Sequence, residues 1–461
     1  MPNPYLPLWE YIPDGEPRVF GNRVYVYGSH DRVGHDQFCD YVLKCWSAPV
    51  DDLGHWTDHG VIFRTRDTFD HPADTDWTKE HNELYAPDVV EKDGKYYLFA
   101  YIIGAKGCVA VSDRPEGPFT LLGRYKYTIP DSVCVNGWFI DPGVLVDDDG
   151  QVYIACGFER SFIAKIEPQD MTHVLDGTYL EHIIPCEVTE NGGFTDPDSR
   201  FYEAASLRKI GDTYYFSYCS NWETRSEEYA DLGLCSIGYM TSKNPEGPYT
   251  FRGDVLINCG NVFKLFGNNH HSITQFRGKY YMFYHTRVLE EKLGSELGFR
   301  SCHVNELTVN DDGTLAPVQQ DLAGVSQIKD FDPYRTNLGI TYSNCAGMLS
   351  TRYLTDGSYM QAVSDPENYD YSWSLVKGVQ FGTDGASNFT AHFKMTAGTT
   401  AQIKVYTDAL GQNEIASADI VPDESGNATI SVPVSKLTDK HDLYFAFKGD
   451  VLSFEDWSFQ K

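Results

Sequence analysis

Five copies of one short pattern, a tight turn followed by an aromatic strand, constrain the fold of this 461-residue chain more than any other feature. Each turn contains Gly, Asn or Asp, which tolerate positive φ, and each following strand is rich in β-branched or aromatic residues. A short apolar segment precedes each turn, so every copy is predicted to be a β-hairpin. The copies span residues 17–27, 88–99, 142–154, 204–216 and 272–283.

Repeated short sheets without helical periodicity are typical of a β-propeller. The repeats stop near residue 316, and the chain from about 341 has alternating strands of its own, such as 402–406 and 442–447. A segment of that size and pattern favours a β-sandwich. We therefore predict an all-β protein with three parts: a five-bladed β-propeller over 1–316, a linker over 317–340, and a β-sandwich (jelly-roll) domain over 341–461.

The charge of the chain argues against nucleic acid and membranes as partners. It has 66 acidic and 37 basic residues and a net charge of -29, which repels phosphate backbones and anionic lipids. No long apolar segment and no signal-peptide pattern is present. The 11 Cys are an odd number without a Cys-x-x-Cys pair, which suits reduced, buried thiols. We therefore expect a cytoplasmic protein, or an extracellular one if a signal was trimmed.

Acidic residues stand at equivalent places just before the inner strands of the repeats. The innermost strands of a propeller all run the same way along its central channel, so residues preceding them meet at one end. A single Asp at a strand start is usually a turn residue, but four carboxyls and a histidine pair in equivalent places indicate a site. They are Asp14, Asp88, Asp141, Glu203 and the pair His270-His271.

Carboxyl groups that converge cannot all ionise easily. Burial and neighbouring charge separate their pKa values, which creates one acid and one base. Hydrolysis of a glycosidic bond needs that division, an acid for the leaving oxygen and a base for water. Metal binding by the same ring is a possible companion role. A non-catalytic protein whose carboxylates only bind sugar hydroxyls is the alternative from another class.

At this point the chain resembles glycoside hydrolase family 43, a family of five-bladed propellers, over residues 1–316. The resemblance is carried by the segments around Asp14 (Ile12 to Gly15), Asp141 (Phe139 to Pro142), Glu203 (Phe201 to Ala204) and Asp88 (Tyr85 to Asp88). It implies an inverting hydrolase with Asp14 as general base, Glu203 as general acid and Asp141 as the residue that orients the acid and tunes its pKa. Asp88 is then a substrate-binding residue, and Glu16 stays a rival base.

The resemblance also implies a calcium ion in the channel, held partly by His270, and an arginine that contacts the sugar. Arg300 is the nearer match to that arginine, and Arg287 is the alternative. No organic cofactor is expected. Trp77, Trp138 and Trp222 lie near blade starts, where an indole ring either stacks on a sugar or packs between blades, and both alternatives stay open.

The tail resembles carbohydrate-binding module family 6 in residues 379–382, 441–449 and 456–459. Its start, residues 339–343, lacks the family's calcium-binding opening, so a sugar-binding tail and a purely structural tail stay open. The predicted function is release of terminal α-L-arabinofuranosyl or β-D-xylosyl residues from plant cell-wall oligosaccharides derived from arabinoxylan, arabinan or xylan. Endo-arabinanase activity is the alternative.

Overall fold

The computed structural model describes residues 3–32, 38–68, 71–78, 82–130, 138–184, 201–220, 234–294, 300–353, 357–362, 372–449 and 451–461. Two compact units form, Met1–Lys44 with Ile62–Val325 and Cys45–Val61 with Ser326–Lys461. The predicted linker 317–340 is therefore shared between the two units. Within the described ranges, no helix is long and apolar enough to span a membrane.

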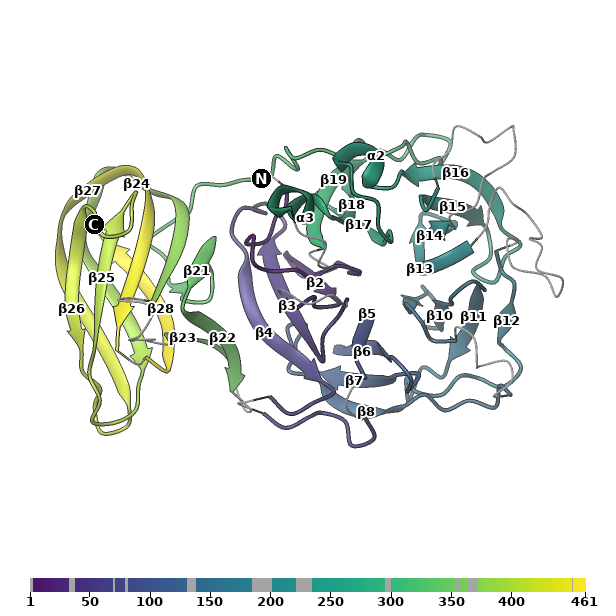
Figure 1. The fold of residues 1–461 in the computed structure, drawn as a ribbon, viewed down its shortest axis with the longest axis horizontal. Helices are drawn as coiled ribbons and strands as arrows, with labels where there is room; N and C mark the ends of the chain where they lie inside the picture. The colour runs from purple at the N-terminus through teal and green to yellow at the C-terminus, as the bar shows by residue number, and fades with distance from the viewer. Residues whose placement is uncertain are drawn as a thin grey trace. The chain divides into compact units, whose positions relative to one another are not determined.

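Five sheets surround a central channel, which confirms the predicted propeller (Figure 1). In each blade the strands follow one another in sequence order from the channel outward. Blades one and two are β1 (Arg18–Phe20), β2 (Arg23–Gly28), β3 (Val42–Pro49) and β4 (Thr57–Arg64), then β5 (Leu84–Lys92), β6 (Lys95–Ile102), β7 (Cys108–Ser112) and β8 (Thr120–Arg124). Blades three and four are β9 (Gly143–Val146), β10 (Val152–Cys156), β11 (Phe162–Ile166) and β12 (Leu180–Glu181), then β13 (Phe201–Ile210), β14 (Thr213–Ser220), β15 (Ile237–Ser242) and β16 (Thr250–Leu256). Blade five is β17 (His271–Phe276), β18 (Lys279–Thr286) and β19 (Ser301–Leu307).

The five predicted hairpins are the two inner strands of the five blades. Each pair is antiparallel. Their turns contain glycines with positive φ, a conformation that glycine adopts without a Cβ clash: Gly21, Gly94, Gly150, Gly211 and Gly278. The inner strands β1, β5, β9, β13 and β17 are neighbours around the ring. The residues that precede them therefore lie around the same end of the channel.

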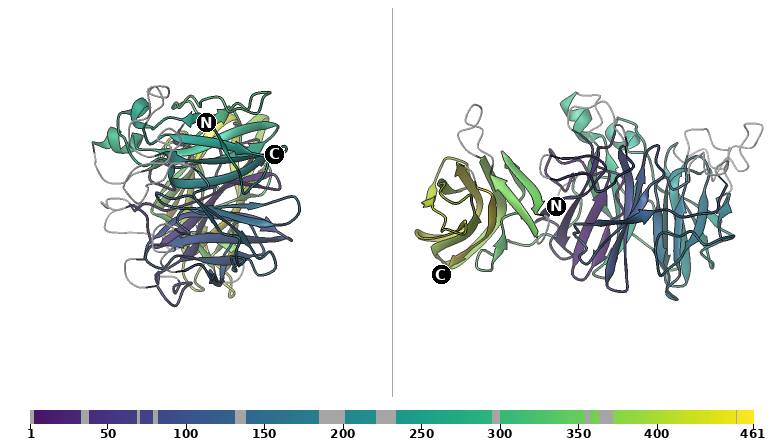
Figure 2. Two further views of the ribbon diagram at one scale, coloured as in Figure 1. Left: turned by 90° about the vertical axis from the view of Figure 1, so that its right-hand side faces the viewer. Right: turned by 90° about the horizontal axis from the view of Figure 1, so that it is seen from below.

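The N-terminal segment bonds to blade five, next to blade one, and so helps to close the ring. The Tyr5 N–H donates to the Cys302 carbonyl at 3.1 Å. The Asn3 amide both donates to and accepts from the Val304 backbone at 3.0 Å. Two short helices, α2 (Gly260–Phe263) and α3 (Val288–Leu293), lie on one face of the ring in the edge-on view (Figure 2).

The second unit is built around one seven-stranded sheet in the order β20-β28-β24-β27-β25-β26, with β21 on β24, plus the β22–β23 hairpin. The strands are β20 (Asn337–Leu338), β21 (Asn344–Ala346), β22 (Met348–Tyr353), β23 (Gly357–Ala362), β24 (Ser372–Lys394), β25 (Ala401–Thr407), β26 (Glu414–Ile420), β27 (Asn427–Lys448) and β28 (Ser453–Gln460). The 23 residues of β24 and the 22 of β27 pair through several register shifts. Such shifts bend strands, so β24 and β27 can each contribute residues to both layers of the predicted sandwich.

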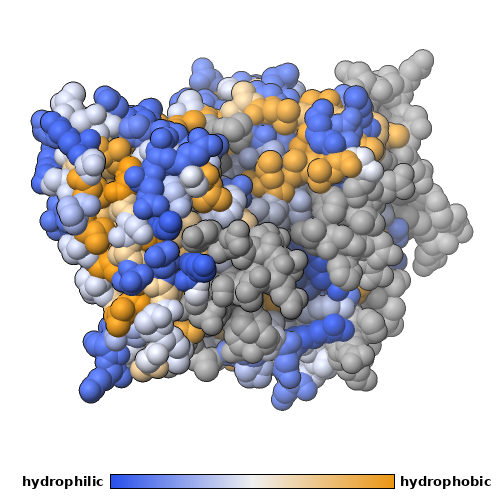
Figure 3. Space-filling view, turned by 60° about the vertical axis from the view of Figure 1, so that its left-hand side comes forward, coloured by the Kyte–Doolittle hydropathy of each residue, from blue (hydrophilic) through white to orange (hydrophobic). Residues whose placement is uncertain are grey.

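On the side of the molecule in Figure 3, the coloured hydrophobic residues form patches separated by hydrophilic ones. Such scattered apolar residues are normal for a folded protein and need no partner to explain them.

Candidate active site

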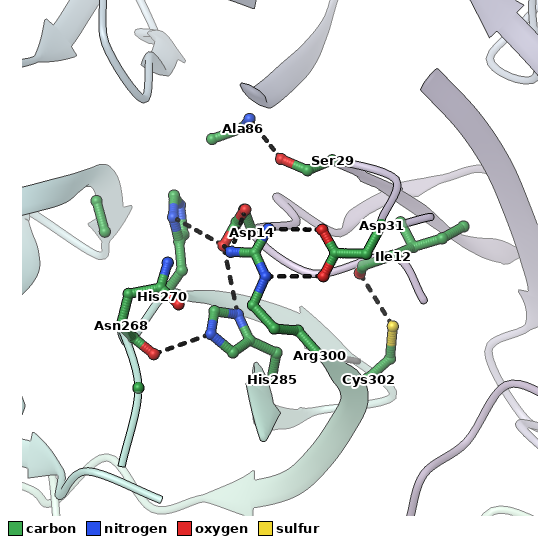
Figure 4. A network of polar contacts seen from close by, with 12 residues as sticks. Ile12, Asp14, Ser29, Asp31, Ala86, Asn268, His270, His285, Arg300 and Cys302 are labelled. Carbon is green, nitrogen blue, oxygen red and sulfur yellow. Dashed lines mark hydrogen bonds and ion pairs between the residues drawn. The ribbon is translucent and has the colours of Figure 1, made fainter. Parts of the chain in front are cut away.

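Asp14 lies beside Arg300 at the channel (Figure 4). Asp14 is 6% exposed and Arg300 is 1% exposed. Arg300 Nη1 donates to Asp14 at 2.8 Å, and its Nε and Nη2 donate to the two oxygens of Asp31 at 2.8 and 2.9 Å. A bidentate arginine–carboxylate pair fixes the plane of the guanidinium group. Asp31 therefore orients Arg300, and Arg300 in turn holds Asp14.

Two histidines of blade five also face Asp14 (Figure 4). His285 Nδ1 is 3.4 Å from Asp14 Oδ1, and its Nε2 is 3.0 Å from the Asn268 carbonyl oxygen. Burial lowers the pKa of His285 to about 4, so its ring is neutral at pH 7. His270 Nδ1 lies 3.8 Å from Asp14 Oδ1 and 3.9 Å from Asp141 Oδ2. His270 thus lies within reach of both carboxyl groups.

Asp141 connects this group to Glu203. The Ala204 N–H donates to Asp141 Oδ2 at 3.1 Å. Glu203, the preceding residue of β13, is paired with Cys219 of β14 between two register shifts. Ala204 has a φ of 60°, so the strand is irregular where the carboxyl emerges. An irregularity of this kind re-aims a side chain out of the sheet. The Glu203 carboxyl lies close enough to Asp141 for their charges to interact.

The three carboxyl groups differ widely in pKa. Burial by itself would raise the pKa of Asp14. The positive charge of Arg300, with those of the nearby histidines, has the larger effect and lowers this pKa to about 2. Burial, with the charge of Asp14, raises the pKa of Asp141 to about 6 against the opposing effect of His270. Burial and then the charge of Asp141 raise the pKa of Glu203 well above its usual value. This arrangement favours an ionised Asp14 together with a protonated Glu203.

Asp88 and Glu16 belong to a second polar cluster. Both oxygens of Asp88 accept bonds from Arg18, and one also accepts from the Val144 N–H at 2.7 Å. Asp88 is fully buried, so its carboxylate is occupied by the protein rather than presented to a sugar. Glu16 accepts a bond from Arg208. The structure thus brings Asp14, and not its rival Glu16, together with His270.

Arg287 lies apart from Asp14. Its Nε and Nη2 donate to the two oxygens of the buried Glu290 at 2.6 Å, and its Nη1 donates to the Phe266 carbonyl. These bonds tie the start of α3 to the segment before β17. Arg300 is therefore the arginine of the site, and its donors hold Asp14 and Asp31.

The tryptophans have different surroundings. Trp138 is 1% exposed, and its ring packs 4.3 Å from that of Phe162 in an apolar cluster, which favours the packing alternative. Trp77 is partly buried, with Arg124 5.2 Å from its ring centre. Trp222 lies outside the described residues.

Among the described residues, the side chains around His270 offer few of the ligands that a calcium ion needs. Calcium takes six to eight oxygen ligands. Within the described part of the chain, no three His, Cys, Asp or Glu side chains are grouped to hold a metal ion. His270 can supply one nitrogen, and water would have to supply most of the remaining ligands.

Asp31, Ser29 and His285 are site residues that the sequence reasoning missed. Ser29 accepts a bond from the Ala86 N–H at 2.8 Å and also bonds to Asp14. A signal was present, because Ser29-His30-Asp31 directly follows the aromatic strand β2, whose end lies beside the start of β1. His285 occupies the corresponding end of β18.

Comparison with known proteins places the chain in a family. The family model described as "Glycosyl hydrolases family 43" matches residues 17–315, and "Carbohydrate binding module (family 6)" matches 341–461. The chain belongs to glycoside hydrolase family 43. Asp14 lies just before the matched range, and Asp141, Glu203, His270 and Arg300 lie within it.

Several known proteins are similar to this chain. A xylosidase/arabinosidase of Thermoclostridium stercorarium is 35% identical over 70% of this chain and 67% of its own length. An arabinoxylan arabinofuranohydrolase of Bacillus subtilis is 30% identical over 96% of this chain and 89% of its own. The solved structure of a family 43 arabinoxylan arabinofuranohydrolase from Bacillus subtilis, in complex with cellotetraose, superposes with a TM-score of 0.74 at 26% identity, covering 98% and 96% of the two chains.

Proposed function

We propose that this family 43 hydrolase releases terminal α-L-arabinofuranosyl residues, β-D-xylosyl residues, or both, from oligosaccharides derived from arabinoxylan or arabinan. The observation that carries the proposal is a buried group in which Asp14, held by Arg300, and Asp141, bonded to the backbone beside Glu203, both lie next to His270. The pKa directions, lowered at Asp14 and raised at Glu203, agree with one base and one acid. The names of the relatives, xylosidase/arabinosidase and arabinoxylan arabinofuranohydrolase, support the substrate class.

The reaction is a single displacement by water. The Asp14 carboxylate takes a proton from the water as its oxygen attacks the anomeric carbon, and Glu203 gives its proton to the leaving glycosidic oxygen. The sugar is released with inverted configuration. Asp141 keeps Glu203 in place through the Ala204 bond, and its negative charge helps Glu203 to keep its proton. Arg300 keeps Asp14 ionised and oriented.

Rates of phenol release from an aryl α-L-arabinofuranoside and an aryl β-D-xyloside, measured side by side, test the proposal. We expect turnover of at least one, with the ratio naming the favoured sugar. No turnover of either would contradict exo-action. Hydrolysis of polymeric arabinan would then indicate an endo-arabinanase, and binding without turnover would indicate a sugar-binding propeller.

A hydrated calcium ion beside His270 belongs to the proposal only as an implication of the family resemblance. A chelator should then lower both the Tm and the rate, and added calcium should restore them. If chelation changed neither, calcium would have no part in this protein.

A further inference from the structure

Two cysteines of blade four lie beside the acid–base site, and the proposed mechanism uses neither. Cys219 is in β14 and Cys235 lies two residues before β15, and both are fully buried. Their sulfur atoms are 3.4 Å apart, and both are free thiols. A disulfide bond is about 2.05 Å long, so the sulfur atoms need to approach by roughly 1.3 Å to form one.

The backbone holds the two thiols in register. The Ser220 N–H donates to the Ser236 carbonyl at 2.8 Å, and the Ser236 N–H donates to Ser220 Oγ at 3.1 Å. Each serine directly follows one of the cysteines. These bonds join the ends of β14 and β15 and keep the sulfur atoms facing each other.

The pair also links two parts of the site. Cys219 is the ladder partner of Glu203, the proposed acid. The Cys235 carbonyl accepts a bond from the Asn269 side chain at 3.2 Å, and Asn269 directly precedes His270. A covalent bond between the thiols would therefore join the strand beside Glu203 to the segment that carries His270.

We propose that Cys219 and Cys235 form a reversible disulfide that slows the hydrolase. Hydrogen peroxide oxidises one thiol to a sulfenic acid and is reduced to water, and the second thiol then displaces the hydroxyl group as a second water while the S–S bond forms. A dithiol such as dithiothreitol reverses the reaction by exchange. Displacements of about 1 Å at an active site can cost up to about 100-fold in rate.

Burial sets the pace of this oxidation. It raises the pKa of the Cys219 thiol well above its ordinary value, and the thiolate is the reactive form. Oxidation is therefore slow at neutral pH and faster in mild alkali. Glu203, the ladder partner of Cys219, is partly exposed, so peroxide has to reach the pair from that side.

The full chain is treated with hydrogen peroxide, alkylated and digested without reductant. We expect a peptide pair cross-linked through Cys219 and Cys235. The Tm should rise by roughly 2–6 °C, because the bond closes a loop of 16 residues in the unfolded chain. The rate on the aryl glycoside should fall roughly 10-fold or more, and dithiothreitol should restore it.

Cys235→Ala and Cys219→Ser should remove all three responses, while Cys108→Ala in blade two should keep them. Absence of the cross-linked peptide from the wild-type digest would overturn the proposal. A cross-linked peptide with unchanged rate and Tm would show that the disulfide does not regulate the enzyme. The peptide and the Tm are measured without turnover, and only the rate rests on the proposed function. Failure of the disulfide proposal is therefore distinguishable from failure of the proposed function.

Discussion

The centre of the propeller and the core of the sandwich bury opposite kinds of side chain. The propeller centre buries charged and titratable groups, namely Asp14, Glu16, Asp31, Asp88, Asp141, Arg208, His270, His285 and Arg300. Over the described residues between 372 and 461, the buried polar residues are Ser372, Ser374, Thr407 and Ser453, and none is charged. There the core is aromatic, with Phe445 lying 5.0 Å from Trp457 and 5.4 Å from Phe454, centroid to centroid.

This difference shows that the free-energy cost of burying charge falls on the propeller. A buried charge is unfavourable unless it is paired and hydrogen-bonded. The propeller meets that condition with pairs between blades, such as Arg300 with Asp31, and leaves Asp14 and Glu203 with opposed proton affinities. Between 372 and 461 the described core has no buried charge to pair, and it is built from apolar and aromatic side chains. Catalysis should therefore respond to single charge changes in the propeller, and the sandwich should respond to packing changes only.

The largest effect should come from Glu203→Gln, which keeps the shape of the side chain and removes its proton. We expect a loss of roughly 10²–10⁴-fold in kcat on a substrate with a poor leaving group. The loss should be much smaller on an aryl glycoside with a good phenolate leaving group, which needs little protonation. Equal losses on both substrates would show that Glu203 is not the general acid.

Arg300→Met should have the next largest effect. It leaves Asp14 and Asp31 buried without their partner, which typically costs about 3–5 kcal/mol of stability. The pKa of Asp14 should rise, because the charge of Arg300 is the leading cause that lowers it, so the acidic limb of the kcat/KM profile should move to higher pH. Lys95→Met, at the exposed Lys95–Asp113 pair, is the control and should change neither. An unmoved acidic limb would contradict Asp14 as the base.

Phe445→Ala tests the other half of the comparison. Replacing a buried Phe by Ala lowers the free energy of unfolding by about 3–5 kcal/mol, here of the sandwich. Circular dichroism should show unfolding that begins at a lower temperature. The kcat on a small aryl glycoside, measured where the variant is folded, should stay at the wild-type value. A large drop in kcat would mean that catalysis depends on the sandwich core as well.

Much of this architecture was predictable because it depends on short sequence patterns within each blade. Turn glycines and aromatic strands recur at every inner hairpin, so the five blades followed from the sequence, and so did the meeting of Asp14, Asp141 and His270. Asp88 was predicted at an equivalent strand start, but it lies within β5, and Arg18, 70 residues away, occupies its carboxylate. Asp31 acts through Arg300 across 269 residues. The position of Asp31 after β2 was visible in the sequence, but its pairing with Arg300 was not. The pairing of Asp88 with Arg18 likewise leaves no local signal, which is why sequence reasoning gave Asp88 a substrate role.

A smaller effect should come from Asp141→Asn. Burial is the main cause of the raised pKa of Glu203, and the charge of Asp141 is the next. Removing that charge should lower the pKa of Glu203 and move the basic limb of the kcat profile to lower pH. The pH profile separates this role from a merely structural one, which would lower kcat at every pH without moving the limb.

The smallest effect should be the pH dependence of unfolding, which should differ between the propeller and the sandwich. The pKa of Asp14 is about 2 in the folded protein and about 3.9 in an unfolded chain, so its contribution is full above pH 4 and is lost as the pH falls to 2. Asp141, with a pKa of about 6, acts in the opposite sense: the folded state retains a proton that the unfolded chain releases, so stability falls between pH 4 and 6. Each shift corresponds to about 2–3 kcal/mol. The propeller should therefore be most stable near pH 4. The sandwich over residues 372–461, whose described core buries no charge, should depend much less on pH. Calorimetry from pH 3 to 7 measures both transitions, and parallel shifts of the two would show that the buried charges are not what separates these halves of the chain.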